Sequence, residues 1–130
     1  MNFEMKVLVI DDMPTMVKII SRMLQNIGFK NIKTAKDGKE AWQMLQEATE
    51  RKDPYQFIVS DWNMPNMTGL ELLKLVRAST DYAKTPFLMI TAESEKEQVV
   101  VAISAGVTNY IAKPFTPPTL EEKIRKIFKF

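Results

Sequence analysis

The sequence contains no cysteine and no histidine. Without cysteine there are no disulfides and no thiolate metal sites, and without histidine the usual zinc sites and histidine acid–base catalysis are excluded as well. Any chemistry must therefore use carboxylate, hydroxyl, amine or phenol groups.

Long apolar runs and a large charge of one sign are missing too. The longest apolar stretches are far shorter than the roughly 20 residues of a membrane span. The opening residues MNFEMKVLVIDD also lack the basic segment and long apolar segment of a secretion signal. A net charge of +2 gives little electrostatic reason to bind nucleic acid. We therefore expect a cytoplasmic protein with no membrane insertion and no nucleic-acid partner.

What remains is an ordinary globular composition, with 45% apolar and 26% charged residues in 130. A chain of this length can bury one sizeable core. No linker, repeat or low-complexity tract divides it, so we expect a single domain over 1–130 and no output domain.

Short apolar runs alternate with segments of helical spacing along the chain. The runs are rich in β-branched residues and predict strands at 6–10, 31–35, 56–60, 86–90 and 108–112. Between them, apolar residues recur at i, i+3, i+4 and i+7, as expected for helices with one buried face. Because the central strands are apolar on both faces, this pattern predicts an α/β fold with a parallel sheet and helices on both faces.

Helix start and stop signals agree with this division. Asp37 with Glu40, and Ser94 with Glu97, have capping-box spacing, and Thr116 precedes a proline as a cap would. Gly28 is predicted to end the first helix.

Polar side chains follow four of the five predicted strands. They are the pair Asp11 and Asp12, then Asp61, Thr91 and Lys113, whereas the second strand offers none. The carboxyl ends of parallel strands meet at one edge of an open sheet, where ligands bind. These five side chains are therefore predicted to form one site.

Three converging carboxylates repel one another, and one lysine cannot offset them. A divalent cation can, and an all-oxygen site favours Mg2+. A carboxylate can attack phosphorus, while a metal and a lysine neutralise the phosphoryl oxygens and a threonine hydroxyl donates to them. Each residue alone also fits a turn, a helix cap or a plain surface position. Their joint placement favours a phosphoryl site.

Four segments resemble the signature regions of the receiver domain of bacterial response regulators: VLVIDDMPTM, IVSDWNMPNMTGLELL, LMITAE and GVTNYIAKPFT. SDWNMPNM and KPFTPPTLEEKIRKIF are particularly similar to the single-domain chemotaxis regulators of the CheY type. The resemblance covers nearly the whole chain and implies a flavodoxin-like (βα)5 fold with strand order 2-1-3-4-5.

The same resemblance implies roles for individual residues. Asp61 would be the phosphoacceptor; Asp12 and Asp61 would bind Mg2+ directly, Asp11 through water, and Asn63 through its main-chain carbonyl. Thr91 and Lys113 would contact the phosphoryl oxygens, and the peptide before Pro114 would be cis. Tyr110 would turn when Thr91 moves, as a switch. Such a protein takes its phosphoryl group from a histidine kinase and later loses it to water, so it is not a conventional enzyme.

Partners are also implied. In this subgroup the face made by the fourth helix, fifth strand and fifth helix binds the flagellar motor switch protein, and here it would carry Lys96, Val99, Ile103, Tyr110 and Lys123. The run of apolar residues at 99–103 independently predicts exposed apolar surface on that helix. We expect a monomer.

Some features depart from the subgroup. Met13 and Pro14 stand where many members have an aromatic residue and a serine, Glu95 adds a charge at the fourth helix, and QEATERKDPYQ lengthens one connection. These leave the phosphorylation site intact but leave the partner open: a module that docks on a protein other than the motor, or a phosphate sink in a phosphorelay. A more remote alternative is an aspartate-nucleophile phosphohydrolase, although such an enzyme carries its nucleophile after the first strand and not after the third. A flavin site is disfavoured because the acidic loop after that strand repels phosphate.

Overall fold

The computed structural model describes residues 2–92 and 96–129. Five strands and five helices alternate along the chain: β1 Lys6–Ile10, α1 Pro14–Ile27, β2 Asn31–Ala35, α2 Gly38–Glu50, β3 Phe57–Asp61, α3 Gly69–Ala78, β4 Phe87–Ala92, α4 Lys96–Ser104, β5 Asn109–Lys113 and α5 Pro117–Phe128. All strand pairs are parallel and the strand order is β2-β1-β3-β4-β5. The predicted fold class and strand order are confirmed.

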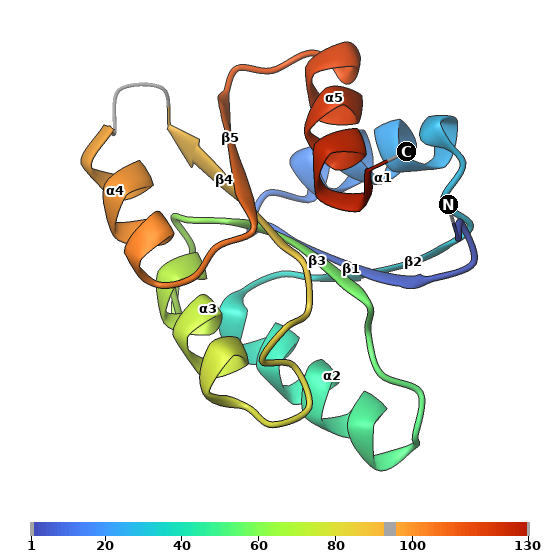
Figure 1. Cartoon of the computed structure of the whole chain (residues 1–130), viewed down its shortest axis with the longest axis vertical. Helices are drawn as coiled ribbons and strands as arrows, with labels where there is room; N and C mark the ends of the chain where they lie inside the picture. Colours follow the sequence, from blue (N-terminus) through green and yellow to red (C-terminus); the bar gives the residue numbers. More distant parts are fainter. Residues whose placement is uncertain (1, 93–95, 130) are drawn as a thin grey trace.

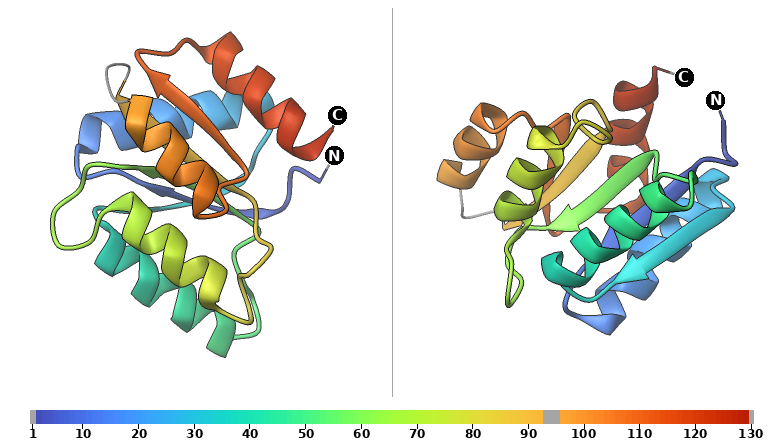
Figure 2. Two further views of the ribbon diagram at one scale, coloured as in Figure 1. Left: turned by 60° about the vertical axis from the view of Figure 1, so that its left-hand side comes forward. Right: turned by 90° about the horizontal axis from the view of Figure 1, so that it is seen from below.

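The sheet separates two layers of helices. Figure 1 shows α1 and α5 on the upper side of the sheet and α2 and α3 on the lower side. In the right-hand view of Figure 2, β2 and β3 point the same way, so their carboxyl ends lie toward one side of the molecule. Helix α4 lies against β4.

Two apolar clusters fill the space between the layers. Alternate residues of β1 divide between them: Leu8 and Ile10 face α2 and α3, and Val7 and Val9 face α1 and α5. This alternation is the period of two of a strand whose faces are both covered. The central strand β3 is buried along its whole length.

The last three strands end later than the sequence predicts. β4 begins at Phe87 because Pro86 has no N–H with which to extend the ladder. It continues to Ala92, so Thr91 lies within the strand. β3 includes Asp61, which pairs in register with Ile90. The Asp61 carboxylate is therefore held in the sheet and not in the loop after it.

The helix ends follow most of the predicted signals. Thr116 caps α5, accepting a hydrogen bond from the Thr119 N–H. Gly28 ends α1 at φ +133°, where a side chain would be strained. The pair Asp37 and Glu40 forms only half of the predicted capping box: Asp37 accepts from the Glu40 N–H, but the Glu40 carboxylate accepts from the Lys36 N–H. The predicted cap at Ser94 lies outside the described residues.

Arg77 on α3 ties α3 to the segments that precede β4 and β5. Its guanidinium donates to the carbonyl oxygens of Gly106 and Thr85, each at 2.7 Å, and to the Thr108 hydroxyl at 3.2 Å. Burial lowers the pKa of Arg77. The half-buried cation is thus stabilised by the carbonyl dipoles of Thr85, before β4, and Gly106, before β5.

Candidate functional site

The predicted site residues lie where the carboxyl ends of neighbouring strands meet. β3 pairs with β1 on one side and β4 on the other, and β5 pairs with β4. In this order the ends of β1, β3, β4 and β5 form a continuous edge. Asp61, Thr91 and Lys113 are therefore carried by the strands themselves, and Asp11 and Asp12 directly follow β1.

Asp11 follows β1 and is only 1% exposed. One carboxylate oxygen, Oδ1, accepts a hydrogen bond from the Met13 N–H at 3.0 Å. The other, Oδ2, has no hydrogen-bond donor among the described residues and lies 3.8 Å from the Lys113 ammonium. Burial raises the pKa of Asp11, and the Met13 hydrogen bond offsets part of this effect.

Asp61 at the end of β3 forms the closest ion pair of the site. Its Oδ1 lies 3.1 Å from Nζ of Lys113, the last residue of β5. Burial still raises the pKa of Asp61, because loss of hydration outweighs the attraction of that lysine. The peptide bond between Lys113 and Pro114 is cis, as the resemblance implies.

Asp12 is exposed and completes an acidic cluster with Asp11 and Asp61. One oxygen from each of the three carboxylates lies within 4.8 Å of the other two. Hard cations such as Mg2+ bind this kind of all-oxygen donor set. The Asp11 Oδ2 atom without a donor and the excess of negative charge both fit a bound cation, so the cluster could hold a metal ion.

Thr91 is 1% exposed, and its hydroxyl oxygen has no hydrogen-bond partner among the described residues. A buried hydroxyl left without a partner costs about 1–3 kcal/mol, so most are satisfied. Thr91 directly follows Ile90, the register partner of Asp61. Its unused hydrogen-bonding capacity therefore lies next to the strand end that carries the buried carboxylate.

Tight packing fixes the chain just after Asp61. The Gly69 N–H donates to the Trp62 carbonyl oxygen at 2.9 Å, and a Cβ at Gly69 would collide with the Asp61 carbonyl oxygen and lie 2.9 Å from Met89 Sδ. Thr68 and Glu71 form a reciprocal capping box at the start of α3. Our sequence analysis missed this box, although threonine followed three residues later by glutamate is its usual signal.

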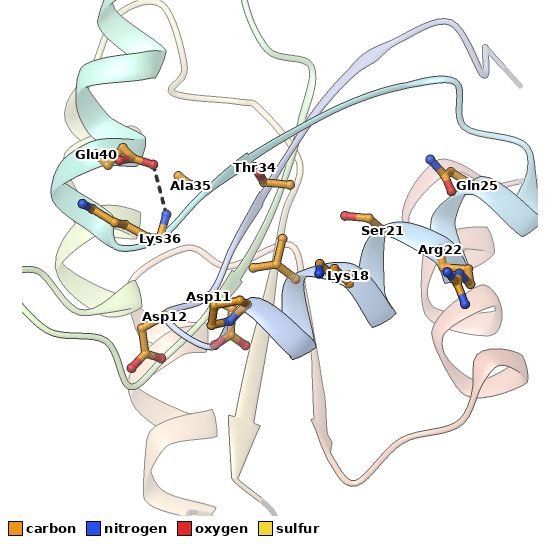
Figure 3. Close-up of a pocket in the computed structure, with 12 residues that line it drawn as sticks. Asp11, Asp12, Lys18, Ser21, Arg22, Gln25, Thr34, Ala35, Lys36 and Glu40 are labelled. Atoms are coloured by element: carbon orange, nitrogen blue, oxygen red, sulfur yellow. Dashed lines mark hydrogen bonds between the residues drawn. The ribbon is translucent and has the colours of Figure 1, made fainter.

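An open groove of about 520 Å³ begins at the acidic cluster and runs between α1 and β2. Figure 3 shows Asp11 and Asp12 at one end of the groove and Arg22 and Gln25 at the other. Lys18 and Lys36 also line it. Asp11 and Asp12 are thus open to a groove whose wall carries both basic side chains and the Glu40 carboxylate.

Comparison with known proteins identifies the family. The model of the response regulator receiver domain matches residues 7–125. The chain belongs to this family.

Chemotaxis proteins are among the relatives of this receiver domain. It is 46% identical over 129 residues to chemotaxis protein CheY-3 of Vibrio cholerae serotype O1, covering 99% of this chain and 95% of that protein. It is 46% identical over 125 residues to chemotaxis protein CheY of Pseudomonas aeruginosa, covering 96% and 97%. The solved structure of chemotaxis response regulator CheY4 of Vibrio cholerae matches with 37% identity and a TM-score of 0.81, covering 95% and 98%. The chain is therefore a CheY-like receiver domain with the flavodoxin-like fold.

The predicted partner surface of this receiver domain is partly apolar and exposed. Val100 and Ile103 on α4 are 64% and 59% exposed, whereas Val99 is half-buried. On β5 the Tyr110 ring is half-buried, and the Lys123 ammonium lies 4.8 Å from its centroid. The exposed apolar surface expected on α4 is confirmed, with Val100 as its most exposed member. Glu95, which the sequence placed near this surface, lies outside the described residues.

One sequence prediction about the receiver site is wrong. The sequence predicts no polar side chain after the second strand. In the structure Asp37 follows β2 by two residues and accepts a hydrogen bond from Asn66 in the loop after β3. The sequence suggested only a helix cap there. No helix in the described part of the chain is long and apolar enough to cross a membrane.

Proposed function

We propose that Asp61 accepts a phosphoryl group and that the phosphorylated receiver domain is the signalling state of a two-component system in chemotaxis. The observation that supports this most directly is the arrangement around Asp61. A buried carboxylate pairs with Lys113 at 3.1 Å, belongs to a three-carboxylate cluster, and neighbours the Thr91 hydroxyl, which has no hydrogen-bond partner in the described part of the chain.

The proposed donor is a phosphohistidine on a histidine kinase. A carboxylate oxygen of Asp61 attacks phosphorus, and the P–N bond breaks with its electron pair staying on the imidazole. Water later attacks the same phosphorus, which releases inorganic phosphate and restores the carboxylate. Attack requires the ionised carboxylate, and the Lys113 ammonium favours that form against the cost of burial.

Asp11, Asp12, Asp61 and the main-chain carbonyl of Asn63 would hold Mg2+. The ion would supply charge neutralisation for the phosphoryl oxygens. On the protein side, Lys113 would hold one phosphoryl oxygen as a point charge, and the Thr91 hydroxyl would donate to another.

Thr91 would also pass the signal on. If its hydroxyl is drawn to the phosphoryl group, space is vacated beside β5 into which the Tyr110 ring can turn. The ring is half-buried under the Lys123 ammonium, so it has room to change its burial. The phosphoryl group then biases a two-state element at the partner surface.

We propose the flagellar motor switch protein as the target, bound through Lys96, Val99, Ile103, Tyr110 and Lys123. Basic groups beside exposed apolar ones suit an acidic amphipathic helix. Docking on a non-motor protein, or a role as a phosphate sink, uses the same phosphorylation site. A phosphohydrolase would require multiple turnover of a phosphate ester. Cytoplasmic location, a single domain over 1–130 and a monomeric state stay predictions.

Intact-mass measurement tests the phosphorylation step. With acetyl phosphate and Mg2+, wild type should gain one phosphoryl group of about 80 Da, and Asp61→Asn and metal-chelated wild type should gain none. Asp53→Asn, a change at an exposed carboxylate elsewhere, should behave as wild type. Equal labelling of Asp61→Asn would refute the assignment. A motor-switch peptide that binds no tighter after phosphorylation or beryllofluoride treatment would favour the non-motor or sink alternatives.

A further inference from the structure

The loop from Trp62 to Thr68 joins β3 to α3 and carries Asn63, whose carbonyl is a proposed metal ligand. The loop is closed at its base by the hydrogen bond from Gly69 N to Trp62 O at 2.9 Å. Near its far end Asn66 adopts φ +68°, in the left-handed region that asparagine tolerates. These backbone features shape the loop, but they do not attach it to the rest of the protein.

The Trp62 N–H bonds to the Ile90 carbonyl oxygen and Met64 is buried in the core, and a further attachment comes from Asp37. Asp37 follows β2 and uses its two carboxylate oxygens separately. Oδ1 accepts from the Glu40 N–H at 2.8 Å and caps α2. Oδ2 accepts from the Asn66 side-chain amide at 2.9 Å. Asp37 is 5% exposed, and these hydrogen bonds, led by the one from Glu40, lower its pKa. The carboxylate therefore stays charged at neutral pH, and the Asn66 contact is a charge-assisted hydrogen bond.

Packing holds the same two segments together. A Cβ at Gly38, the first residue of α2, would lie 2.7 Å from the Met67 carbonyl oxygen and 2.9 Å from Met67 Cβ. The loop backbone thus lies directly against the start of α2. A cap alone would need only one oxygen of Asp37, so the second oxygen and this close approach call for another explanation.

We propose that Asp37 and Asn66 form a latch that positions the loop after Asp61, so that the Asn63 carbonyl is already in place when Mg2+ binds. Asp37 is then a positioning residue for metal binding and phosphorylation, acting through Asn66 and touching neither the metal nor the phosphoryl group. The inference rests on the proposed function of Asp61, and it adds the β2–α2 connection to the site.

The size of the effect follows from preorganisation. If the loop adopts its metal-binding conformation for only a fraction of the time, the apparent Mg2+ affinity is reduced by that fraction. At the lower end of its range, a charge-assisted hydrogen bond shifts such a local equilibrium by about tenfold. Breaking the latch should therefore weaken Mg2+ binding by about 5–20-fold.

Two variants remove the latch and keep the local structure. Asp37→Ser retains a good helix cap but has one oxygen where the aspartate has two. Asn66→Gly keeps the backbone free to adopt positive φ but removes the amide. Asp37→Asn is the conservative variant: its amide can still bond to Asn66 if that side chain turns over, so it should recover part of the wild-type behaviour. Thr116→Ala, which damages the cap of α5, controls for stability loss alone.

The readout is Mg2+ titration of Trp62 fluorescence in a Trp42→Phe background, where Trp62 is the only tryptophan. We expect 5–20-fold weaker Mg2+ binding in Asp37→Ser and Asn66→Gly, no further loss in the double variant, and little change in Thr116→Ala. Amide hydrogen exchange at Gly69, measured without metal, should speed up in both latch variants.

Two results would overturn the latch: unchanged Mg2+ affinity in both variants despite lowered stability, or losses that add in the double variant. Either result would mean that Asp37 acts only as the cap of α2. Failure of the proposed function is separate, because it would appear as no phosphorylation of wild type.

Discussion

The charge of Asp11 should destabilise the metal-free protein, so Asp11→Asn should be more stable than wild type. The asparagine can still accept the Met13 hydrogen bond through its carbonyl oxygen. The oxygen it loses, Oδ2, is the one with no hydrogen-bond donor among the described residues. The substitution therefore removes a buried charge without removing its only described hydrogen bond.

The magnitude depends on three effects. With an effective dielectric constant of about 20, the Asp61 carboxylate within 4.8 Å repels Asp11 by about 3.5 kcal/mol or more, and Lys113 at 3.8 Å attracts it by about 4.4 kcal/mol. These nearly cancel, and the exposed Asp12 carboxylate of the same cluster adds a solvent-screened repulsion of the same sign as that of Asp61. Burial then decides the sign of the stability change, since a buried polar oxygen without a hydrogen-bond donor costs about 1–3 kcal/mol. We expect Asp11→Asn to gain about 2 kcal/mol.

Urea unfolding in the presence of a chelator measures this gain, which corresponds to a midpoint shift of roughly 1 M. The gain should depend on pH. Burial raises the pKa of Asp11 above its usual 3.8, so the folded wild type holds this proton more tightly than the unfolded chain. The associated stability is present below pH 3.8 and is lost as pH rises through the raised pKa. The advantage of Asp11→Asn should therefore be small near pH 4 and full at pH 7.5.

Two further arms make the test decisive. Mg2+ should stabilise wild type more than Asp11→Asn, because the ion offsets the charge that the variant lacks. Asp81→Asn, at an exposed carboxylate outside the cluster, should leave stability within about 0.5 kcal/mol. If Asp11→Asn is no more stable than wild type at pH 7.5 without metal, burial does not dominate the energy of Asp11.

Three other substitutions test separate parts of the structure. Gly69→Ala places a methyl group against the Asp61 carbonyl oxygen and should lower the free energy of unfolding by about 2 kcal/mol and weaken Mg2+ binding, as measured by urea unfolding and metal titration. Arg77→Met loses the hydrogen bond to the Gly106 carbonyl oxygen and those to Thr85 and Thr108, and should cost about 2–4 kcal/mol with faster exchange of the Gly106 amide. Arg77→Lys should recover only part of this because it lacks the guanidinium fork; unchanged exchange would contradict this role. Ile103→Ser, at a side chain 59% exposed, should change stability by less than about 0.5 kcal/mol and, under the proposed function, weaken binding of a motor-switch peptide to the phosphorylated form.

The strand exits were predictable because their pattern is local. A short β-branched run followed by Asp11, by Asp61 or by Lys113 can be located in the sequence alone, and the exit rule for parallel sheets then brings these groups together. The predicted strand ends were less accurate at β3, β4 and β5. There, pairing with neighbouring strands extends the ladder past the apolar run, and pairing is not encoded in one segment.

The contacts of Asp37 with Asn66 and of Arg77 with Gly106 could not be predicted in the same way. Each pair is separated by 29 positions in the chain, and neither has a periodic pattern that marks it. Asp37 was assigned a cap from its spacing to Glu40, and that spacing contains no information about its second oxygen.

The sequence by itself determined the fold class, the order of strands and helices, and the residue types gathered at one edge of the sheet. It did so because apolar periodicity and strand-end positions depend on near neighbours in the chain. Tertiary structure alone decided the energetic state of those groups. Asp61 is bonded to Lys113, while one buried Asp11 oxygen and the Thr91 hydroxyl have no hydrogen-bond partner among the described residues. Burial and pairing are set by what the folded sheet brings from other strands, and the pKa of each carboxylate follows from that environment.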